Sequence, residues 1–205
     1  MPDLELENEL RASHAVIAGI DEAGRGPLAG PVVVGAAILP WDFTHPLVND
    51  SKKISEKKRE HLFDELVQSL DIKWAVAVVE SVEIDAVNIL RATHLGMARA
   101  VAALARQVDY CLIDGLPVPN FPYLHRGVVK GDGKSLSIAT ASIFAKVTRD
   151  RLMREHAQEF PVYGFEKHKG YGTKAHLEAL RTHGPCRLHR YTFQPVAQLV
   201  LPIGD

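Results

Sequence analysis

The sequence predicts an α/β protein in which a mixed sheet carries helices on its faces. Three hydrophobic segments rich in Val, Ala and Ile come first, and two short extended segments follow later in the chain. Helical segments lie between these two groups and after them. Strands interleaved with helices are typical of a sheet whose faces are covered by helices. The expected strands are residues 15–20, 32–39, 72–79, 110–113 and 126–130.

Five segments are predicted to be helical. The segment 55–70 begins at Ser55, a residue type that caps helix N-termini, and places Leu62, Leu66 and Leu70 on one face. A long segment, 135–160, is followed directly by a proline, which cannot continue a helix. The remaining helical segments are residues 82–91, 93–107 and 173–182.

The size and composition fit one domain, or one domain with an appendage. The chain has 205 residues and a net charge of −1, so overall charge alone predicts no particular partner. Its two cysteines are too few for a disulfide scaffold, and the acidic N-terminal stretch lacks a signal-peptide pattern. We expect a cytoplasmic protein without a membrane segment. We also expect residues 1–150 to form the sheet domain and residues 151–205 a helical C-terminal extension packed on it.

Four acidic residues lie where extended segments run out into glycine. Asp21 and Glu22 follow the first strand, Asp114 follows the fourth, and Asp132 stands between two glycines. If the first and fourth strands are neighbours, their ends meet at one edge of the sheet. Carboxylates held together raise each other's pKa unless a cation neutralises them, and oxygen ligands suit Mg²⁺ or Mn²⁺. Two such ions about 4 Å apart would suit phosphodiester cleavage.

Another interpretation of these acids stays open at this point. Asp-Gly and Gly-Asp pairs are also common in turns that have no chemical role. In addition, neighbouring residues of a strand point to opposite faces, so Asp21 and Glu22 serve one site only if the chain bends there. Gly24 and Gly26 would permit that bend.

Two glycine-rich stretches superficially resemble nucleotide-binding loops. GRGPLAG, residues 24–30, is followed by a strand, whereas the dinucleotide pattern requires a helix. GKS, residues 133–135, ends like a P-loop, but Val128 stands where that pattern requires glycine. We therefore reject both patterns, although the GKS amides at a helix start remain candidates for holding a phosphate. Cys186 and His189 supply only half of a structural zinc site, so we expect no zinc.

Basic residues gather in DSKKISEKKRE and EKHKGYGTK. Such runs are usually solvated helix faces, and we keep this interpretation for residues 57–59. Lys52 precedes the helix in a loop, where holding a phosphate is more plausible. Tyr171 stands between two glycines with cations on both sides, so it is suited to stack on a base or sugar. Packing of its loop onto the core explains this tyrosine equally well.

Six motifs follow one another along most of the chain, leaving out the first dozen residues and the last few. They are GIDEAGRGPLAGPVVVGA, NDSKKISEKKR, LIDG, VVKGDGKSLSIATASIFAKVTRDRLM, YGFEKHKGYGT and HGPCRLHR. Motifs of this length, in this order, are highly specific. Together they resemble those of ribonuclease HII, the bacterial type 2 ribonuclease H family.

The resemblance implies a ribonuclease H-like fold, with a five-stranded mixed sheet flanked by helices and a helical C-terminal part. It implies an endonuclease that cuts the RNA strand of RNA–DNA hybrids. Such an enzyme also cuts 5′ of single ribonucleotides embedded in duplex DNA. Hydrolysis would use two Mn²⁺ or Mg²⁺ ions and leave 3′-hydroxyl and 5′-phosphate ends.

The resemblance also assigns site residues. The catalytic carboxylates, which are the metal ligands, match Asp21, Glu22, Asp114 and Asp132. The residues that contact the ribonucleotide's 2′-hydroxyl and the adjacent phosphate match Gly24, Arg25 and Gly26. Tyr171 resembles the tyrosine that reads the RNA–DNA junction at that sugar.

Further residues of these motifs are expected to support the site or bind the substrate backbone. They are Lys52, Lys134, Ser142 and Lys146. Asp150 lies in VTRD and could be taken for a fifth metal ligand. We interpret Asp150 instead as an ion-pair residue of the long helix.

Three alternatives to this function remain open. The type 3 hybrid nucleases have a similar fold and similar carboxylates, but GRG together with GYGT favours type 2. A hybrid-binding protein without turnover would not need all four acids. In a purely structural protein, the acids would be ordinary turn residues. QPVAQLVLPIGD contains no clamp-binding motif, so we expect no tether to the replication clamp. We also expect a monomer whose partners are RNA–DNA hybrid and ribonucleotide-containing duplex DNA.

Overall fold

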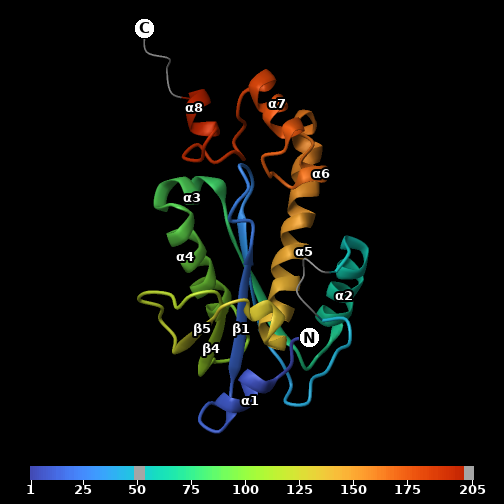
Figure 1. Cartoon of the computed structure of the whole chain (residues 1–205), viewed down its shortest axis with the longest axis vertical. Coiled ribbons are helices and arrows are strands. Elements are labelled where there is room, and N and C mark those ends of the chain that lie inside the picture. The colour runs from blue at the N-terminus through green and yellow to red at the C-terminus, as the bar shows by residue number, and fades with distance from the viewer. Residues whose placement is uncertain (49–53, 201–205) are drawn as a thin grey trace.

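A five-stranded mixed sheet forms the centre of the computed structural model, which describes residues 1–48 and 54–200 (Figure 1). The strand order is β3-β2-β1-β4-β5. β2 pairs antiparallel with both β1 and β3, whereas β4 pairs parallel with both β1 and β5. The expected α/β fold is therefore present. The strands are β1 (Ile17–Ala23), β2 (Val32–Ile38), β3 (Lys73–Val79), β4 (Tyr110–Asp114) and β5 (His125–Val128).

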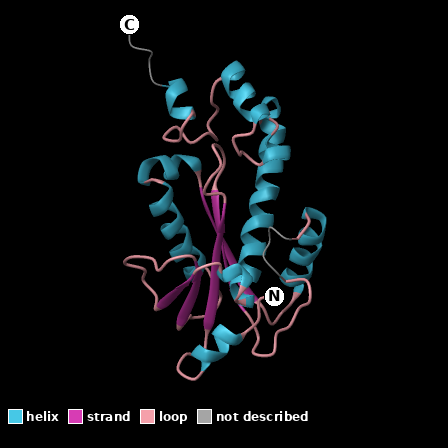
Figure 2. Cartoon of the chain, in the orientation of Figure 1, coloured by secondary structure: helices cyan, strands magenta, loops and turns pink. Residues whose placement is uncertain are grey.

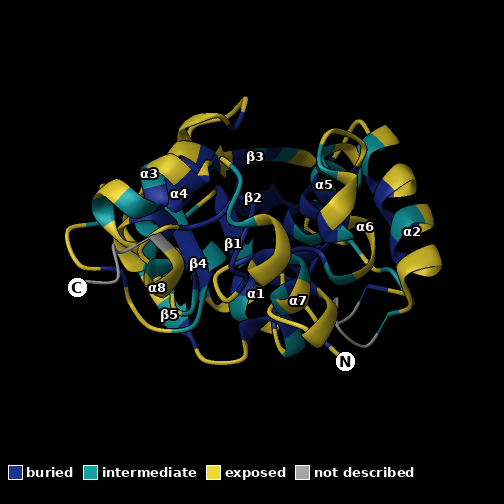
Figure 3. Cartoon of the chain, turned by 90° about the horizontal axis from the view of Figure 1, so that it is seen from above, coloured by how far each residue is buried: buried dark blue, intermediate teal, exposed yellow. Residues whose placement is uncertain are grey.

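Helices cover both faces of this sheet (Figure 2). α4 packs on one face against β2 and β3, and α5 packs on the other against β1 and β2. Figure 3 shows the central strands buried between these layers. The helices are α1 (Glu5–Arg11), α2 (Glu56–Gln68), α3 (Ser81–Val87), α4 (Ile89–Ala102), α5 (Leu136–Glu159), α6 (Phe165–His168), α7 (Lys174–His183) and α8 (Val196–Val200). Two short 3₁₀ helices are η1 (Gly131–Gly133) and η2 (Pro161–Tyr163).

Alternate residues of β1 face the two helical layers. Ala18 and Ile20 belong to the apolar core that includes residues of α4. Gly19 faces α5 so closely that a Cβ atom added there would lie 2.1 Å from the carbonyl carbon of Ser137. Asp21 is two residues further along the strand, so its side chain lies on the α5 side as well. Glycine at position 19 thus brings α5 close enough to contact the end of β1.

The helix predicted at residues 135–160 is confirmed, and its N-terminal half is buried on all sides. Ser135 caps it by accepting a hydrogen bond from the Ile138 amide. Residues 136–145 are all buried, because α5 lies between the sheet and α2. Leu62 and Phe144 belong to the apolar cluster between these two helices.

Three local predictions were wrong. The boundary between the expected helices 82–91 and 93–107 lies instead at Asn88, which has a φ of 70° and whose side chain accepts a hydrogen bond from the Arg91 amide. Asparagine tolerates positive φ and also caps helices, so it ends α3 and starts α4. Leu70 lies beyond the end of α2 and is 86% exposed, so it does not extend the apolar face.

The third error is α1, which the polar N-terminal sequence did not predict. Its Glu7 is 2% exposed and accepts hydrogen bonds from the hydroxyls of Ser135 and Ser137 and from the Ser137 amide. A carboxylate at the N-terminus of α5 is stabilised by the unpaired amides and the helix dipole. A contact between the N-terminal segment and the start of α5 therefore fixes this helix.

The C-terminal helices lie beyond one end of the sheet, above the turn that joins β1 to β2 (Figure 1). α6 packs on α5, and α7 contacts η2. The boundary that we expected at residue 150 falls inside α5, and the division into two parts stays a prediction. Across the described residues, we find no helix with the length and apolar character needed to traverse a bilayer.

Candidate active site

The ends of β1 and β4 bring two of the predicted acids to one edge of the sheet. Ile20 pairs with Ile113, so the next residues, Asp21 in β1 and Asp114 at the end of β4, lie on adjacent parallel strands. The neighbour relationship that the sequence analysis required is therefore present. The strand is longer than the sequence analysis predicted: Asp21 and Glu22 do not follow β1 but are part of it, and they pair with β2.

Asp21 is a buried carboxylate among like charges. It is 6% exposed, and burial raises its pKa well above the usual range. The nearby carboxylates of Glu22 and Asp114 raise the pKa further. Hydrogen bonds from the Ser142 hydroxyl and the Glu22 amide, the latter 2.7 Å long, act in the opposite direction. The raising effects win, so a positive ion beside Asp21 would relieve an existing electrostatic cost.

Asp132 follows directly on a residue that contacts Asp114. The Gly131 amide donates a hydrogen bond of 2.6 Å to Asp114 Oδ1. Asp132 is the next residue, in η1, and is 8% exposed. The loop after β5 therefore returns to the end of β4 and carries the fourth acid with it. We call Asp21, Glu22, Asp114 and Asp132 the carboxylate edge.

A pocket of about 410 Å³ opens beside this edge. Asp21 and Glu22 both line it, although neighbouring strand residues normally point to opposite faces. β1 ends at the next residue, and Gly24 adopts a φ of +99°, which turns the chain away. Asp114 and Asp132 do not line this pocket. The other lining residues are Ala23, Gly24, Arg25, Gly26, Ser142, Lys146, Arg149 and Tyr171.

The segment 24–31, which we call the glycine turn, is held by two buried arginines that the sequence analysis missed. Arg190 donates hydrogen bonds to the carbonyl oxygens of Gly24, Arg25 and Gly30. Arg149 donates to the carbonyls of residues 29 and 31. Both guanidinium groups are fully buried, and burial lowers the pKa to about 9 for Arg190 and about 10 for Arg149. Their only sequence signal was membership of the motifs HGPCRLHR and VTRD.

Tyr171 stands across the pocket from the glycine turn. A Cβ atom added at Gly26 would lie 3.7 Å from Tyr171 Cε1. The two loops also contact through backbone atoms, since the Leu28 amide donates to the Gly170 carbonyl at 2.9 Å. Tyr171 is 47% exposed, so its ring does not serve to pack this loop onto the core. The exposed ring and the glycine turn thus form two sides of one recess.

The lysine of α5 that was predicted to support the site lines the pocket, whereas Asp150 does not. Lys146 Nζ donates a hydrogen bond of 2.7 Å to Asp150 Oδ1, and burial lowers the Lys146 pKa. Asp150 also lies 3.6 Å from the Arg59 guanidinium and is 3% exposed. Asp150 is therefore paired with cations on two sides, which supports its interpretation as an ion-pair residue.

One further predicted residue lies away from the pocket. Lys134 is exposed and does not line the pocket. The prediction that the amides of residues 133–135 hold a phosphate was wrong, because all three donate to the carbonyls of Lys130 and Gly131. Lys52 falls outside the described residues.

The carboxylate edge has the donor chemistry that a divalent cation needs. Hard cations such as Mg²⁺ and Mn²⁺ bind carboxylate oxygens, and Asp21 carries a desolvated carboxylate whose neighbours are also acids. Within the described ranges, no three Asp, Glu, His or Cys side chains already stand in the arrangement of a metal site. The residues therefore fit a divalent ion in charge and type, and ion binding would have to draw the side chains together.

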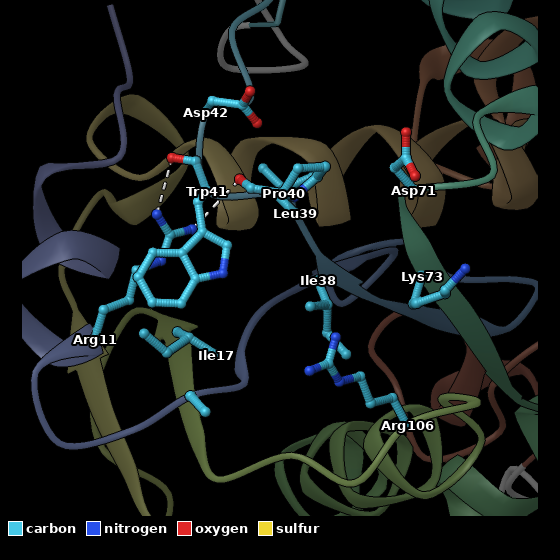
Figure 4. Close-up of a pocket in the computed structure, with 11 residues that line it drawn as sticks. Arg11, Ile17, Ile38, Leu39, Pro40, Trp41, Asp42, Asp71, Lys73 and Arg106 are labelled. Atoms are coloured by element: carbon cyan, nitrogen blue, oxygen red, sulfur yellow. Dashed lines mark hydrogen bonds between the residues drawn. The ribbon is translucent and has the colours of Figure 1, made fainter.

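Another pocket, of about 350 Å³, lies at the opposite end of β1 (Figure 4). Its charges are mixed, with Asp42 and Asp71 beside Lys73 and Arg106. The Arg11 guanidinium lies over the Trp41 ring at 4.7 Å and donates to the backbone carbonyls of Pro40 and Trp41. This pocket contains no group of adjacent acids comparable to the carboxylate edge.

A family model described as Ribonuclease HII matches residues 18–196. The chain belongs to the ribonuclease HII family. As a ribonuclease HII it is an endoribonuclease of the type 2 ribonuclease H class. Family membership supports endonuclease activity on RNA–DNA hybrids. It also decides against the type 3 enzymes and against a protein without turnover.

Individual ribonucleases HII cover nearly the whole chain. The chain is 55% identical over 185 residues to ribonuclease HII of Endomicrobium trichonymphae, with 90% of this chain and 88% of that protein covered. The ribonuclease H2 structure from Pyrococcus horikoshii OT3 gives a TM-score of 0.76 at 26% identity, with 90% and 96% covered. The ribonuclease HII of a PCNA complex from Archaeoglobus fulgidus gives 0.72 at 25% identity, with 87% and 95% covered.

Proposed function

We propose that this ribonuclease HII cuts the RNA strand of hybrids and also cuts 5′ of single ribonucleotides in duplex DNA, leaving 3′-hydroxyl and 5′-phosphate ends. The observation that carries the proposal is one recess with two different walls. Asp21 and Glu22 lie on one side, and the glycine turn and Tyr171 frame the other. A single site can therefore hold the sugar to be recognised next to the phosphate to be cut.

The four acids of the carboxylate edge would hold the divalent ions. Two Mn²⁺ or Mg²⁺ ions bound there would supply the charge that activates a water molecule for attack and stabilises the leaving 3′-oxygen. The burial of Asp21 supports this role, because its raised pKa reflects a charge that lacks compensation from neighbouring cations. Ser142 orients that carboxylate through its hydroxyl group.

Recognition of the ribonucleotide would fall to the glycine turn and Tyr171. Close approach of a sugar to the backbone requires residues without side chains, and Gly24 and Gly26 meet this need at the pocket wall. The 2′-hydroxyl is the group that distinguishes RNA from DNA. Arg25 is exposed beside them and suits the adjacent phosphate, while the exposed Tyr171 ring suits stacking against the sugar or base.

Product mapping on a labelled duplex with one embedded ribonucleotide tests this proposal. We expect one cut, on the 5′ side of the ribonucleotide, that disappears when a chelator removes divalent ions. An all-DNA duplex of the same sequence should stay intact, and an RNA–DNA hybrid serves as the positive control. Cleavage of the hybrid without cleavage at the lone ribonucleotide would refute the proposal. A cut on the 3′ side would also refute it.

A further inference from the structure

The dipeptide His189–Arg190 lies behind both walls of the recess. Its backbone runs alongside the glycine turn, with Ala29 and His189 forming an antiparallel bridge. The Arg190 amide donates to the Leu28 carbonyl at 2.8 Å, and the Gly30 amide donates to the Leu188 carbonyl at 2.8 Å. Together with the hydrogen bonds of the Arg190 guanidinium, these contacts engage four carbonyl groups of the turn, those of residues 24, 25, 28 and 30.

The neighbouring His189 begins a chain of hydrogen bonds that ends at Tyr171. His189 Nε2 lies 3.1 Å from His176 Nε2, and His176 Nδ1 lies 2.9 Å from the Tyr171 carbonyl oxygen. At the other end, the Cys186 amide donates to His189 Nδ1 at 3.0 Å. Both imidazoles are fully buried.

The ends of this chain determine its proton positions. A carbonyl oxygen only accepts, so His176 Nδ1 carries a proton and, in the neutral ring, His176 Nε2 accepts. His189 Nε2 must then donate, which leaves His189 Nδ1 free to accept from the Cys186 amide. Every donor finds an acceptor in this one arrangement. Burial lowers the pKa of His176, and that of His189 to about 4, so both rings stay neutral near pH 7.

We propose that His189 and Arg190, acting with His176, are positioning residues that lock the glycine turn and Tyr171 into one recognition unit. This inference rests on the proposed function, in which these two walls read the ribonucleotide. Neither histidine nor Arg190 lines the pocket, so all three act through the backbone that they hold. One buried dipeptide thus supports both walls, in addition to the direct hydrogen bond between Leu28 and Gly170.

Two replacements of His176 separate this role from general stability. In His176→Asn, the side-chain amide can occupy the position of Nδ1 and still donate to the Tyr171 carbonyl. In His176→Gln, the amide reaches toward the Nε2 position, and the Tyr171 carbonyl loses its donor. Both variants place a neutral amide in the same buried site, so each controls for the other. His183→Gln, at an exposed histidine of α7, controls for histidine loss elsewhere in this region.

The decisive readout is selectivity between two substrates. We expect His176→Gln to lower kcat/KM for the lone-ribonucleotide duplex about tenfold relative to the RNA–DNA hybrid, mainly through KM. His176→Asn and His183→Gln should change this ratio less than about twofold. Equal losses on both substrates, or equal ratios for the Asn and Gln variants, would overturn the inference.

Hydrogen exchange of the Arg190→Lys variant tests the coupling without relying on cleavage. Lysine keeps the charge but lacks the planar fork that reaches several carbonyls. We expect faster exchange at the amides of Leu28 and Gly30 and also at Tyr171, with Arg187→Lys as the exposed control in the same segment. Faster exchange in the turn but not at Tyr171 would overturn the coupling. If the wild-type enzyme fails on the lone ribonucleotide, the proposed function falls while this readout still decides the coupling.

Discussion

The glycine turn and the carboxylate edge border the same recess, yet they treat buried charge in opposite ways. Behind the turn, the guanidinium groups of Arg149 and Arg190 donate to five carbonyl oxygens, so the buried charges are matched by dipoles. At the edge, Asp21 is buried near two other carboxylates, and their charges raise its pKa. The buried arginines have hydrogen-bond acceptors, whereas Asp21 has like charges as neighbours.

This difference suits the turn to substrate recognition and the edge to metal binding. Buried hydrogen-bonded groups restrict the turn to one conformation, which suits recognition of a sugar by close backbone contact. A buried carboxylate among like charges, such as Asp21, costs stability but favours binding of a divalent ion. Substitutions at the turn should therefore weaken selectivity and folding, whereas substitutions at the edge should remove catalysis and leave the fold as stable or more stable.

Asp21→Asn should produce the largest effect on catalysis. Loss of a ligand removes several kcal/mol of transition-state stabilisation, which corresponds to a fall in kcat of about 1000-fold or more. In the presence of chelator, the same variant should unfold at a higher temperature than the wild type, because burial and the neighbouring carboxylates oppose ionisation of Asp21 and asparagine does not ionise. Cleavage assays and thermal unfolding measure the two effects. Asp42→Asn, an exposed acid at the opposite pocket, should change neither.

The wild type and Asp21→Asn also allow a test of the raised Asp21 pKa by varying the pH. A folded-state pKa above the unfolded value means that folding favours the protonated acid, so this contribution to stability is present at low pH. It is lost as pH rises from the ordinary carboxyl pKa, about 4, through the raised folded value. Without divalent ions, the unfolding free energy of wild type should therefore fall relative to Asp21→Asn over this range. A difference that is constant with pH would contradict the assignment.

Gly19→Ala should have the largest effect on folding. The added Cβ atom would lie 2.1 Å from a backbone carbonyl carbon of α5, so helix and sheet must separate. We expect a loss of about 3 kcal/mol, or roughly 6–12 °C in Tm. Gly133→Ala is the matched control, because nothing lies within 4 Å of its Cβ position. Equal Tm values for the two variants would show that close packing of α5 on β1 does not limit stability.

Tyr171→Ala should have an intermediate effect, confined to substrate binding. Loss of one stacking ring is worth about 1–3 kcal/mol, so KM for the lone-ribonucleotide duplex should rise roughly 5- to 150-fold. Tyr171→Phe keeps the ring and should stay close to wild type. Steady-state kinetics with both variants distinguish stacking from a role of the hydroxyl group, which would make the Phe variant as weak as the Ala variant.

Lys134→Ala should have the smallest effect. This lysine is exposed and does not line the pocket, and the amides around it are already paired. We expect less than a twofold change in kcat/KM on either substrate at moderate salt. A tenfold loss would mean that the substrate path extends over η1, away from the recess.

The features of the site that depend on local sequence could be predicted. Apolar segments ending in acids placed Asp21 and Asp114 at strand ends, and glycines marked the turn. The stretch around Tyr171 was identified, although its core-packing alternative could be rejected only from the exposed ring. These features depend on residues close together in the chain, so their spacing carries the information.

The remaining features depend on partners far apart in the chain. Arg190 donates hydrogen bonds to carbonyl groups within residues 24–30. Because every residue type has a backbone carbonyl, no sequence pattern predicts this contact. The burial of Glu7 depends in the same way on the start of α5. The helix break at Asn88 is different, because an asparagine before a helix is a recognisable cap that was overlooked.

Calorimetric titration of Mn²⁺ in two buffers of different ionisation enthalpy measures metal uptake and proton release together. If anionic side chains crowded at the strand ends gather divalent ions, the wild type should take up Mn²⁺ and release protons as Asp21 ionises. Asp21→Asn should bind far more weakly and release fewer protons. Equal uptake by both proteins, with equal proton release, would contradict the account.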